Sequence, residues 1–205
     1  MNVDLLAAWL LSIMLSASPP GRSRHPVEAI ETADQGKARY AAIARAIATV
    51  SLDPNEAALF AGQDARAKTA ALLLAISYHE SHWRRHVDLG LGSRALGGGR
   101  YWCMMQIAVD RGKTPEGWTG KQLVQRRDRC FRRGLHILQR GKRFCRSRGG
   151  TSFINHYASG YCDRGGKAVA LRTRTYREWL RARPIPKRAA AKPKRQRPRA
   201  PKGKR

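Results

Sequence analysis

Apolar side chains recur every three or four residues along most of the chain, which is the spacing of one face of an α-helix. The clearest stripe runs from Ala65 to Trp83 and begins directly after Asp64, a residue type that favours the N-cap position. This pattern predicts a long helix. The same spacing predicts further helices over residues 26–47, 122–139, 151–158 and 168–181.

Patterns typical of β-strands are scarce. The longest is a short stretch from Met104 to Val109, and the glycine-rich residues 88–102 before it predict a loop with a short hairpin. The predicted fold class is therefore mainly α, a helical domain with a small β or loop element. A chain of 205 residues accommodates one such domain together with terminal extensions.

The first residues form a separate apolar segment. Leu5–Leu15 is an apolar run of signal-peptide length, although Asp4 and the lack of Lys or Arg before it are unusual for a signal peptide. We interpret residues 1–25 as a signal peptide or an anchor, and a short hydrophobic helix packed on the domain is the alternative. The run is shorter than the roughly 18–20 residues of a membrane span, which excludes a multipass membrane protein.

The other end of the chain is strongly basic. The formal net charge is +27, and residues 181–205 hold twelve Lys or Arg, five Pro and no acid, so that removing these twelve charges leaves +15 on residues 1–180. This composition predicts a disordered tail that attaches to an anionic cell-wall polymer or a membrane surface. No recognised nucleic-acid-binding motif accompanies it, so a specific nucleic acid is not expected. The folded domain is placed at residues 26–180.

Four cysteines lie in this domain, at Cys103, Cys130, Cys145 and Cys162, with no zinc-finger spacing among them. An even number of separated cysteines suits two disulfides, which form in an oxidising compartment. Of the three connectivities we favour Cys103–Cys130 with Cys145–Cys162, because each closes a short loop that flanks a helix. This indicates an extracytoplasmic protein (periplasmic, secreted, wall-associated or carried by a phage virion), and buried free thiols in a cytosolic protein are the alternative.

Glu80 is the residue that points to chemistry. It follows Ile76 by four positions and Leu73 by seven, which puts its carboxylate on the apolar face of the predicted helix. Burial favours the neutral form of a carboxyl group, and a protonated carboxyl near neutral pH is what the general acid of a glycosidase requires. A glutamate at a frayed helix end, paired with Arg84 or Arg85, is the alternative interpretation.

The residues around Glu80 follow a recognisable order. His79-Glu80-Ser81 is followed by the glycines from Gly90 to Gly99, by the sequence CMMQI at 103–107, and by HYASG at 156–160. This order resembles the lysozyme-like lytic transglycosylases related to goose lysozyme. In that family a Glu-Ser pair at the end of a buried helix precedes a Gly-rich segment, a Gly-Leu-Met-Gln-Ile strand and an Ala-Tyr-Asn-Ala-Gly helix end. The resemblance covers residues 60–180 and implies a lysozyme-like fold, peptidoglycan as partner, and no cofactor or metal.

The resemblance also implies roles for single residues. Glu80 would be the catalytic acid and base, Ser81 would fix the end of its helix, and Tyr157 would lie close to the carboxylate. Met105 and Gln106 would line the glycan cleft, and Trp102 offers a face on which a sugar ring can stack. The residues implied to bind substrate are thus Ser81, Met105, Gln106, Tyr157 and Trp102. The chain departs from the family where Cys103 replaces Gly, Ala158 replaces Asn and Gly97 replaces Ser.

The number of carboxylates distinguishes two mechanisms. A glycosidase with two carboxylates places a second Asp or Glu across the scissile bond. Near Glu80 in the sequence the candidates are Asp88 and Asp110, both in predicted loops. If neither reaches the site, Glu80 acts alone and the muramoyl 6-hydroxyl closes a 1,6-anhydro ring. If Asp88 holds a water molecule, the protein is a hydrolytic muramidase.

Two other functions compete with this interpretation. A zinc hydrolase could use His82, His86 and Asp88, since the two histidines are four residues apart, but Trp83 breaks the H-E-x-x-H motif. A non-enzymatic basic protein that binds nucleic acid or wall would explain the tail but not the Glu80 sequence.

Overall fold

The computed structural model describes residues 1–21, 31–91 and 100–187. The structure is mainly helical, which confirms the predicted fold class. In chain order its elements are α1 (Val3–Ala17), α2 (Ala33–Leu52), α3 (Ala65–Ser81), α4 (Arg85–Asp88), β1 (Tyr101–Trp102), β2 (Ile107–Ala108), η1 (Asp110–Gly112), α5 (Gly120–Gln125), α6 (Arg127–Phe144), η2 (Arg146–Arg148), α7 (Ser152–Ser159) and α8 (Gly166–Ala182).

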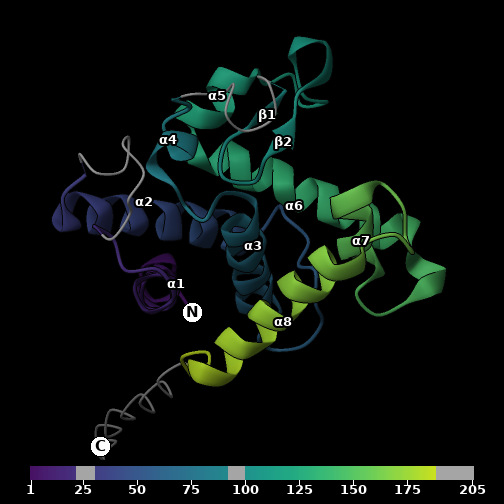
Figure 1. The fold of residues 1–205 in the computed structure, drawn as a ribbon. Coiled ribbons are helices and arrows are strands. Elements are labelled where there is room, and N and C mark those ends of the chain that lie inside the picture. The colour runs from purple at the N-terminus through teal and green to yellow at the C-terminus, as the bar shows by residue number, and fades with distance from the viewer. Residues whose placement is uncertain (22–30, 92–99, 188–205) are drawn as a thin grey trace, which may run out of the picture.

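Helix α3 lies in the middle of the molecule, in contact with α1, α2, α6 and α8 (Figure 1). Neighbours on several sides explain why Leu72, Leu73 and Leu74 are all fully buried, although three successive residues point in different directions around a helix. The helix follows Asp64 as predicted, but the Asp64 side chain makes no capping hydrogen bond. It ends two residues before Trp83, because His82 and Trp83 both adopt the left-handed conformation that stops a helix.

Helix α1 packs along α2 and contributes Leu6, Leu10 and Met14 to the core, all of them fully buried. The indole nitrogen of Trp9 also donates a hydrogen bond of 3.1 Å to the backbone oxygen of Arg183. This is the arrangement expected from the packed-helix alternative for the N-terminal segment. Among the described residues, no helix has both the length and the apolar character needed to cross a membrane.

The helix predicted over residues 122–139 is two helices. Residue Arg126 leaves the helical conformation between α5 and α6, and Thr119 with Gln122 forms a capping box that starts α5. The strand predicted from Met104 to Val109 is also shorter than expected. Only β2 is extended, paired antiparallel with β1, and residues 103–106 form the turn between them.

Both disulfides pair as predicted. Cys103–Cys130 attaches the β1–β2 turn to α6, and Cys145–Cys162 attaches the end of α6 to the loop after α7.

The boundary predicted before residue 181 is wrong, because α8 continues to Ala182 and Ile185 still packs against the core. Residues 188–205, which make up most of the predicted disordered tail, lie outside the described residues.

Candidate active site

Glu80 occupies the last turn of α3, and its side chain is 18% exposed. The sequence prediction of a largely buried carboxyl group therefore agrees with its position. Burial raises the pKa of Glu80 above its ordinary value, even though the nearby Arg172 acts in the opposite direction. The site thus holds a carboxyl group that is easier to protonate than an exposed glutamate.

The partner of this carboxyl group is Arg172 of α8. Its Nη2 donates a hydrogen bond of 2.6 Å to Glu80 Oε1, and the arginine side chain is only 11% exposed. The sequence interpretation that paired Glu80 with Arg84 or Arg85 is wrong, since the contact comes from a residue 92 positions away. Arg172 lies between Val169 and Tyr176 on the apolar face of α8, and a charge on such a face is the sequence signal that was missed.

Tyr157 of α7 connects the site to the β1–β2 turn. Its hydroxyl donates a hydrogen bond of 2.5 Å to the backbone oxygen of Met105. The pKa of Tyr157 is raised well above its ordinary value, first by burial and then by the negative charge of Glu80. Tyr157 therefore stays a neutral hydrogen-bond donor, on which the charge of Glu80 acts.

Ser81 is 3% exposed and faces the protein interior. Its hydroxyl donates to the backbone oxygen of Ser77 and accepts from the backbone nitrogen of Trp83. These bonds hold the end of α3 where the helix stops, as the resemblance implied. The expectation that Ser81 also binds substrate finds no support in this burial, because the hydroxyl is engaged by the backbone at the end of α3.

Of the residues in and next to the turn, Met105 differs from the expectation, whereas the expected roles of Gln106 and Trp102 stay predictions. Met105 is fully buried, and its side chain packs against Gly134 of α6 so closely that a Cβ there would lie 2.5 Å from the methionine methyl carbon. Met105 therefore supports the turn through packing and cannot line an open cleft with its side chain. Gln106 is partly exposed and its amide donates to the backbone oxygen of Cys103. Trp102 is partly exposed, with its ring lying over Gly120.

Neither acidic residue that was considered as a second carboxylate is free. Both oxygens of Asp88 accept hydrogen bonds from Arg127, at 2.8 and 2.5 Å, and the Asp88 side chain is 1% exposed. Asp110 is exposed and pairs with Arg100. A buried carboxylate engaged at both oxygens cannot position an attacking water molecule.

A third acidic residue, Glu116, was missed by the sequence interpretation. Burial acts to raise its pKa, but hydrogen bonds from His136 and Thr114, together with the charge of Arg133, hold it below the ordinary value. The charge of Arg133 also affects Tyr157. Glu116 is thus a carboxylate that favours its ionised form: Arg133 and His136 bind its Oε1, whereas its buried Oε2 has no hydrogen-bond partner among the described residues.

The zinc alternative loses its proposed ligands. Asp88 is engaged by Arg127, the His82 side chain is exposed with its ring 4.9 Å from that of Tyr78, and His86 is buried. In the part of the chain that the structure describes, no group of three His, Cys, Asp or Glu residues is arranged to hold a metal ion.

Replacing Arg172 with methionine is expected to move the pH dependence of any activity that requires protonated Glu80. Without the positive charge, burial acts unopposed and the pKa of Glu80 rises further, so the alkaline limb of the profile of kcat/KM against pH shifts to higher pH. The pKa of Glu80 is higher in the folded than in the unfolded chain, so the folded state binds more protons. The contribution of Glu80 to the free energy of unfolding is therefore complete below its ordinary pKa of 4.5. This contribution is lost as the pH rises through the raised pKa of the folded state.

The measurements are activity profiles and thermal unfolding across pH. Arg174→Met is the matched control, because it removes the same charge from an exposed position of α8 that pairs with Glu178 and not with Glu80. An unshifted profile in Arg172→Met would show that the ion pair does not influence Glu80.

Comparison with known proteins does not assign the chain to a family. No protein-family model, curated protein or solved structure matches the chain. The proposal below therefore depends on the residues and their geometry.

Proposed function

We propose that the protein is a peptidoglycan lytic transglycosylase that cleaves the β-1,4 bond between N-acetylmuramic acid and N-acetylglucosamine. The observation that carries this is the carboxyl group of Glu80, whose pKa burial raises and whose charge acts on Tyr157. The order of sequence motifs around Glu80, which resembles that enzyme family, supports the same function.

Glu80 performs two proton transfers in this mechanism. In its protonated form it gives its proton to the glycosidic oxygen as the bond from that oxygen to the anomeric carbon breaks. The resulting carboxylate then accepts the proton of the muramoyl 6-hydroxyl, whose oxygen bonds to the anomeric carbon and closes the 1,6-anhydro ring. Glu80 regains its proton, and no water molecule is consumed.

Arg172 suits the second half of this cycle. The carboxylate produced by the first proton transfer is stabilised by the guanidinium 2.6 Å away, while burial favours return of the proton. The two opposing influences keep both protonation states of Glu80 accessible, as a residue that is first an acid and then a base requires.

The engagement of Asp88 favours this mechanism over hydrolysis. A hydrolytic muramidase needs a second carboxylate or a positioned water molecule on the far side of the sugar. Both oxygens of Asp88 are instead bound by Arg127, and Asp110 pairs with Arg100 at the surface.

Mass spectrometry of digested peptidoglycan is expected to show anhydro-muropeptides, each lighter by one water than the hydrolysed product. The difference follows from the intramolecular attack by the 6-hydroxyl. Products that carry only reducing ends would overturn the transglycosylase mechanism and support the muramidase. A digest without cleaved glycan would contradict both.

The two disulfides are compatible with an oxidising, extracytoplasmic location, where peptidoglycan is accessible. In this proposal the Lys- and Arg-rich C-terminal residues hold the enzyme on anionic wall polymers or on a membrane surface.

A further inference from the structure

Two aromatic side chains project from the surface where α6 ends. Phe144 is 70% exposed and Tyr161 is 54% exposed, which is unusual for large apolar rings. Each directly precedes a half-cystine, and the Cα atoms of Cys145 and Cys162 are 5.4 Å apart. The disulfide therefore brings the two rings, which are far apart in the sequence, to the same part of the surface.

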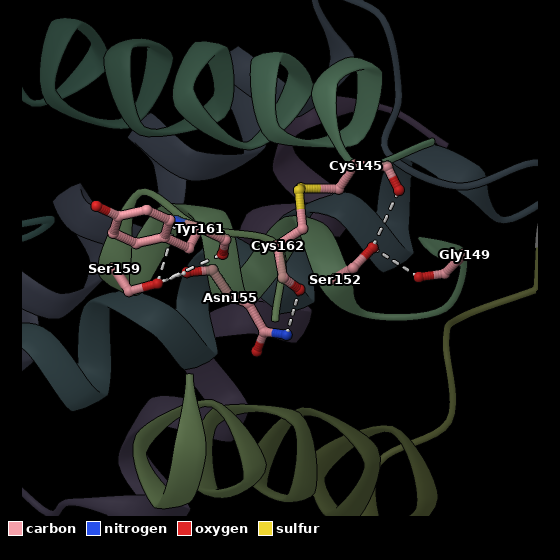
Figure 2. Close-up of a disulfide and its surroundings, with 7 residues drawn as sticks. All are labelled: Cys145, Gly149, Ser152, Asn155, Ser159, Tyr161 and Cys162. Carbon is pink, nitrogen blue, oxygen red and sulfur yellow. Dashed lines mark hydrogen bonds between the residues drawn. A yellow bond between two sulfur atoms is a disulfide. The ribbon is translucent and has the colours of Figure 1, made fainter. Parts of the chain in front are cut away.

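This part of the surface is held rigidly. Figure 2 shows the Cys145–Cys162 disulfide together with the hydrogen bonds that attach both loops to α7. The Asn155 side chain donates to the backbone oxygen of Cys162, and the backbone nitrogen of Tyr161 donates to the Ser159 hydroxyl. On the other loop, the Ser152 hydroxyl donates to the backbone oxygen of Gly149. The disulfide and these hydrogen bonds thus hold the two loops that carry the exposed rings.

The charges around the rings are positive with one exposed exception, Asp163, which lies next to Arg164. Arg140 and Arg143 precede Phe144 by four residues and by one, η2 adds Arg146 and Arg148, and the guanidinium of Arg164 lies 4.4 Å from the centre of the Tyr161 ring. All five arginines are exposed. Within residues 1–21, 31–91 and 100–187, none of them forms an ion pair. We call this surface the α6-end patch: Arg140, Arg143, Phe144, Arg146, Arg148, Tyr161 and Arg164.

We propose that the α6-end patch docks the folded domain on an anionic phospholipid bilayer. Guanidinium groups bind lipid phosphates through paired hydrogen bonds, and unpaired arginines give up no internal ion pair in doing so. Phe144 enters the boundary between headgroups and acyl chains, and Tyr161 sits at headgroup level with its hydroxyl in water. This interaction is separate from glycan cleavage and does not rest on it.

The chemistry of the patch favours a bilayer over the other polyanions. A single-stranded nucleic acid needs a groove in which successive bases stack on aromatic rings, whereas this patch has two highly exposed rings at a helix end. The disulfide that builds the patch also suits an oxidising compartment, in which intracellular nucleic acid is absent.

The test compares two triple variants of the full chain by sedimentation with vesicles made of equal parts of phosphatidylcholine and phosphatidylglycerol. The patch variant carries Arg143→Gln, Arg146→Gln and Arg148→Gln. The control carries Lys37→Gln, Lys121→Gln and Arg177→Gln, which are exposed positions outside the patch. Both lose the same charge and both keep the basic C-terminal residues.

The patch variant is expected to partition roughly a hundred-fold more weakly than the unmodified protein, and the control only a few-fold more weakly. Equal loss in the two variants would overturn the proposal, because net charge alone would then explain the attraction. Unchanged vesicle binding by the patch variant would also overturn it. If that variant instead lost binding to purified peptidoglycan or to DNA, that polymer would be the partner.

A further variant, Phe144→Ser, tests how much the Phe144 ring contributes to vesicle binding. Phe144→Ser is expected to remove the part of vesicle binding that persists at high salt, because insertion of an apolar ring is not screened whereas the arginine contribution is. The same salt dependence as in the unmodified protein would show that Phe144 does not enter the bilayer. Phe144 is exposed, so unchanged circular dichroism is expected in this variant.

Discussion

Glu80→Gln is expected to reduce clearing of peptidoglycan suspensions by at least about a thousand-fold while leaving the fold intact, since general acid–base catalysis contributes factors of this size. Glutamine has nearly the same shape as glutamate, and its amide oxygen can still accept the hydrogen bond from Arg172. It cannot donate a proton to the glycosidic oxygen or remove one from the 6-hydroxyl. Both halves of the proposed mechanism are therefore lost together.

The measurement combines turbidity of the suspension with thermal unfolding of each variant. Glu178→Gln is the matched control, because Glu178 is an exposed carboxylate on α8 that pairs with Arg174. This control should retain full activity. Substantial clearing by a well-folded Glu80→Gln protein would remove Glu80 from the catalytic role, and Glu116 would then be the next carboxylate to test.

Loss of the Cys103–Cys130 disulfide is expected to cost both stability and activity. The bridge joins residues 27 apart, and the entropy of closing such a loop corresponds to about 3.5 kcal/mol of unfolding free energy. Cys103 also has a φ of 58°, in the left-handed region that favours glycine. Without the bridge this conformation is no longer held by α6. The turn that presents the backbone oxygen of Met105 to Tyr157 then loosens.

The informative comparison is between the two disulfides. Replacing Cys145 and Cys162 with alanine removes a bridge between residues 17 apart and should cost about 3 kcal/mol, a similar amount. Below the unfolding transition, however, only the variant Cys103→Ala with Cys130→Ala should lose activity per folded molecule. Cys103→Gly with Cys130→Ala should recover part of it, since glycine accepts the positive φ. Equal activity in all three would contradict a role for the turn.

The same position shows how a cysteine takes up a conformation suited to glycine. Glycine begins the Gly-Leu-Met-Gln-Ile motif of the proposed enzyme class, and the structure gives Cys103, at the start of CMMQI, a φ in the region that favours glycine. A half-cystine is held in that conformation by its bond to Cys130. Glycine adopts a positive φ because it has no side chain, whereas Cys103 is kept at a positive φ by its covalent bond to Cys130.

The spacing of apolar residues predicted helix α3 and the burial of Glu80, because this spacing is a local property of one helix. The cysteine spacing led to the right pairs for the same reason, since each bridge closes a short loop. The sequence did not predict the break at Arg126 or the end of α3 at Ser81. A single residue that leaves the helical conformation changes little in the regular spacing of apolar residues around it.

Taken alone, the sequence determined a mainly helical domain, its two disulfides and a buried glutamate that can serve as an acid. Only the tertiary structure decided that Arg172 pairs with Glu80, that Arg127 occupies Asp88, and that α1 packs into the core. Each of these depends on a contact between segments distant along the chain. Side-chain spacing within one helix does not say which other helix will lie against it, so the electrostatics of Glu80 follow from the packing of α8 on α3.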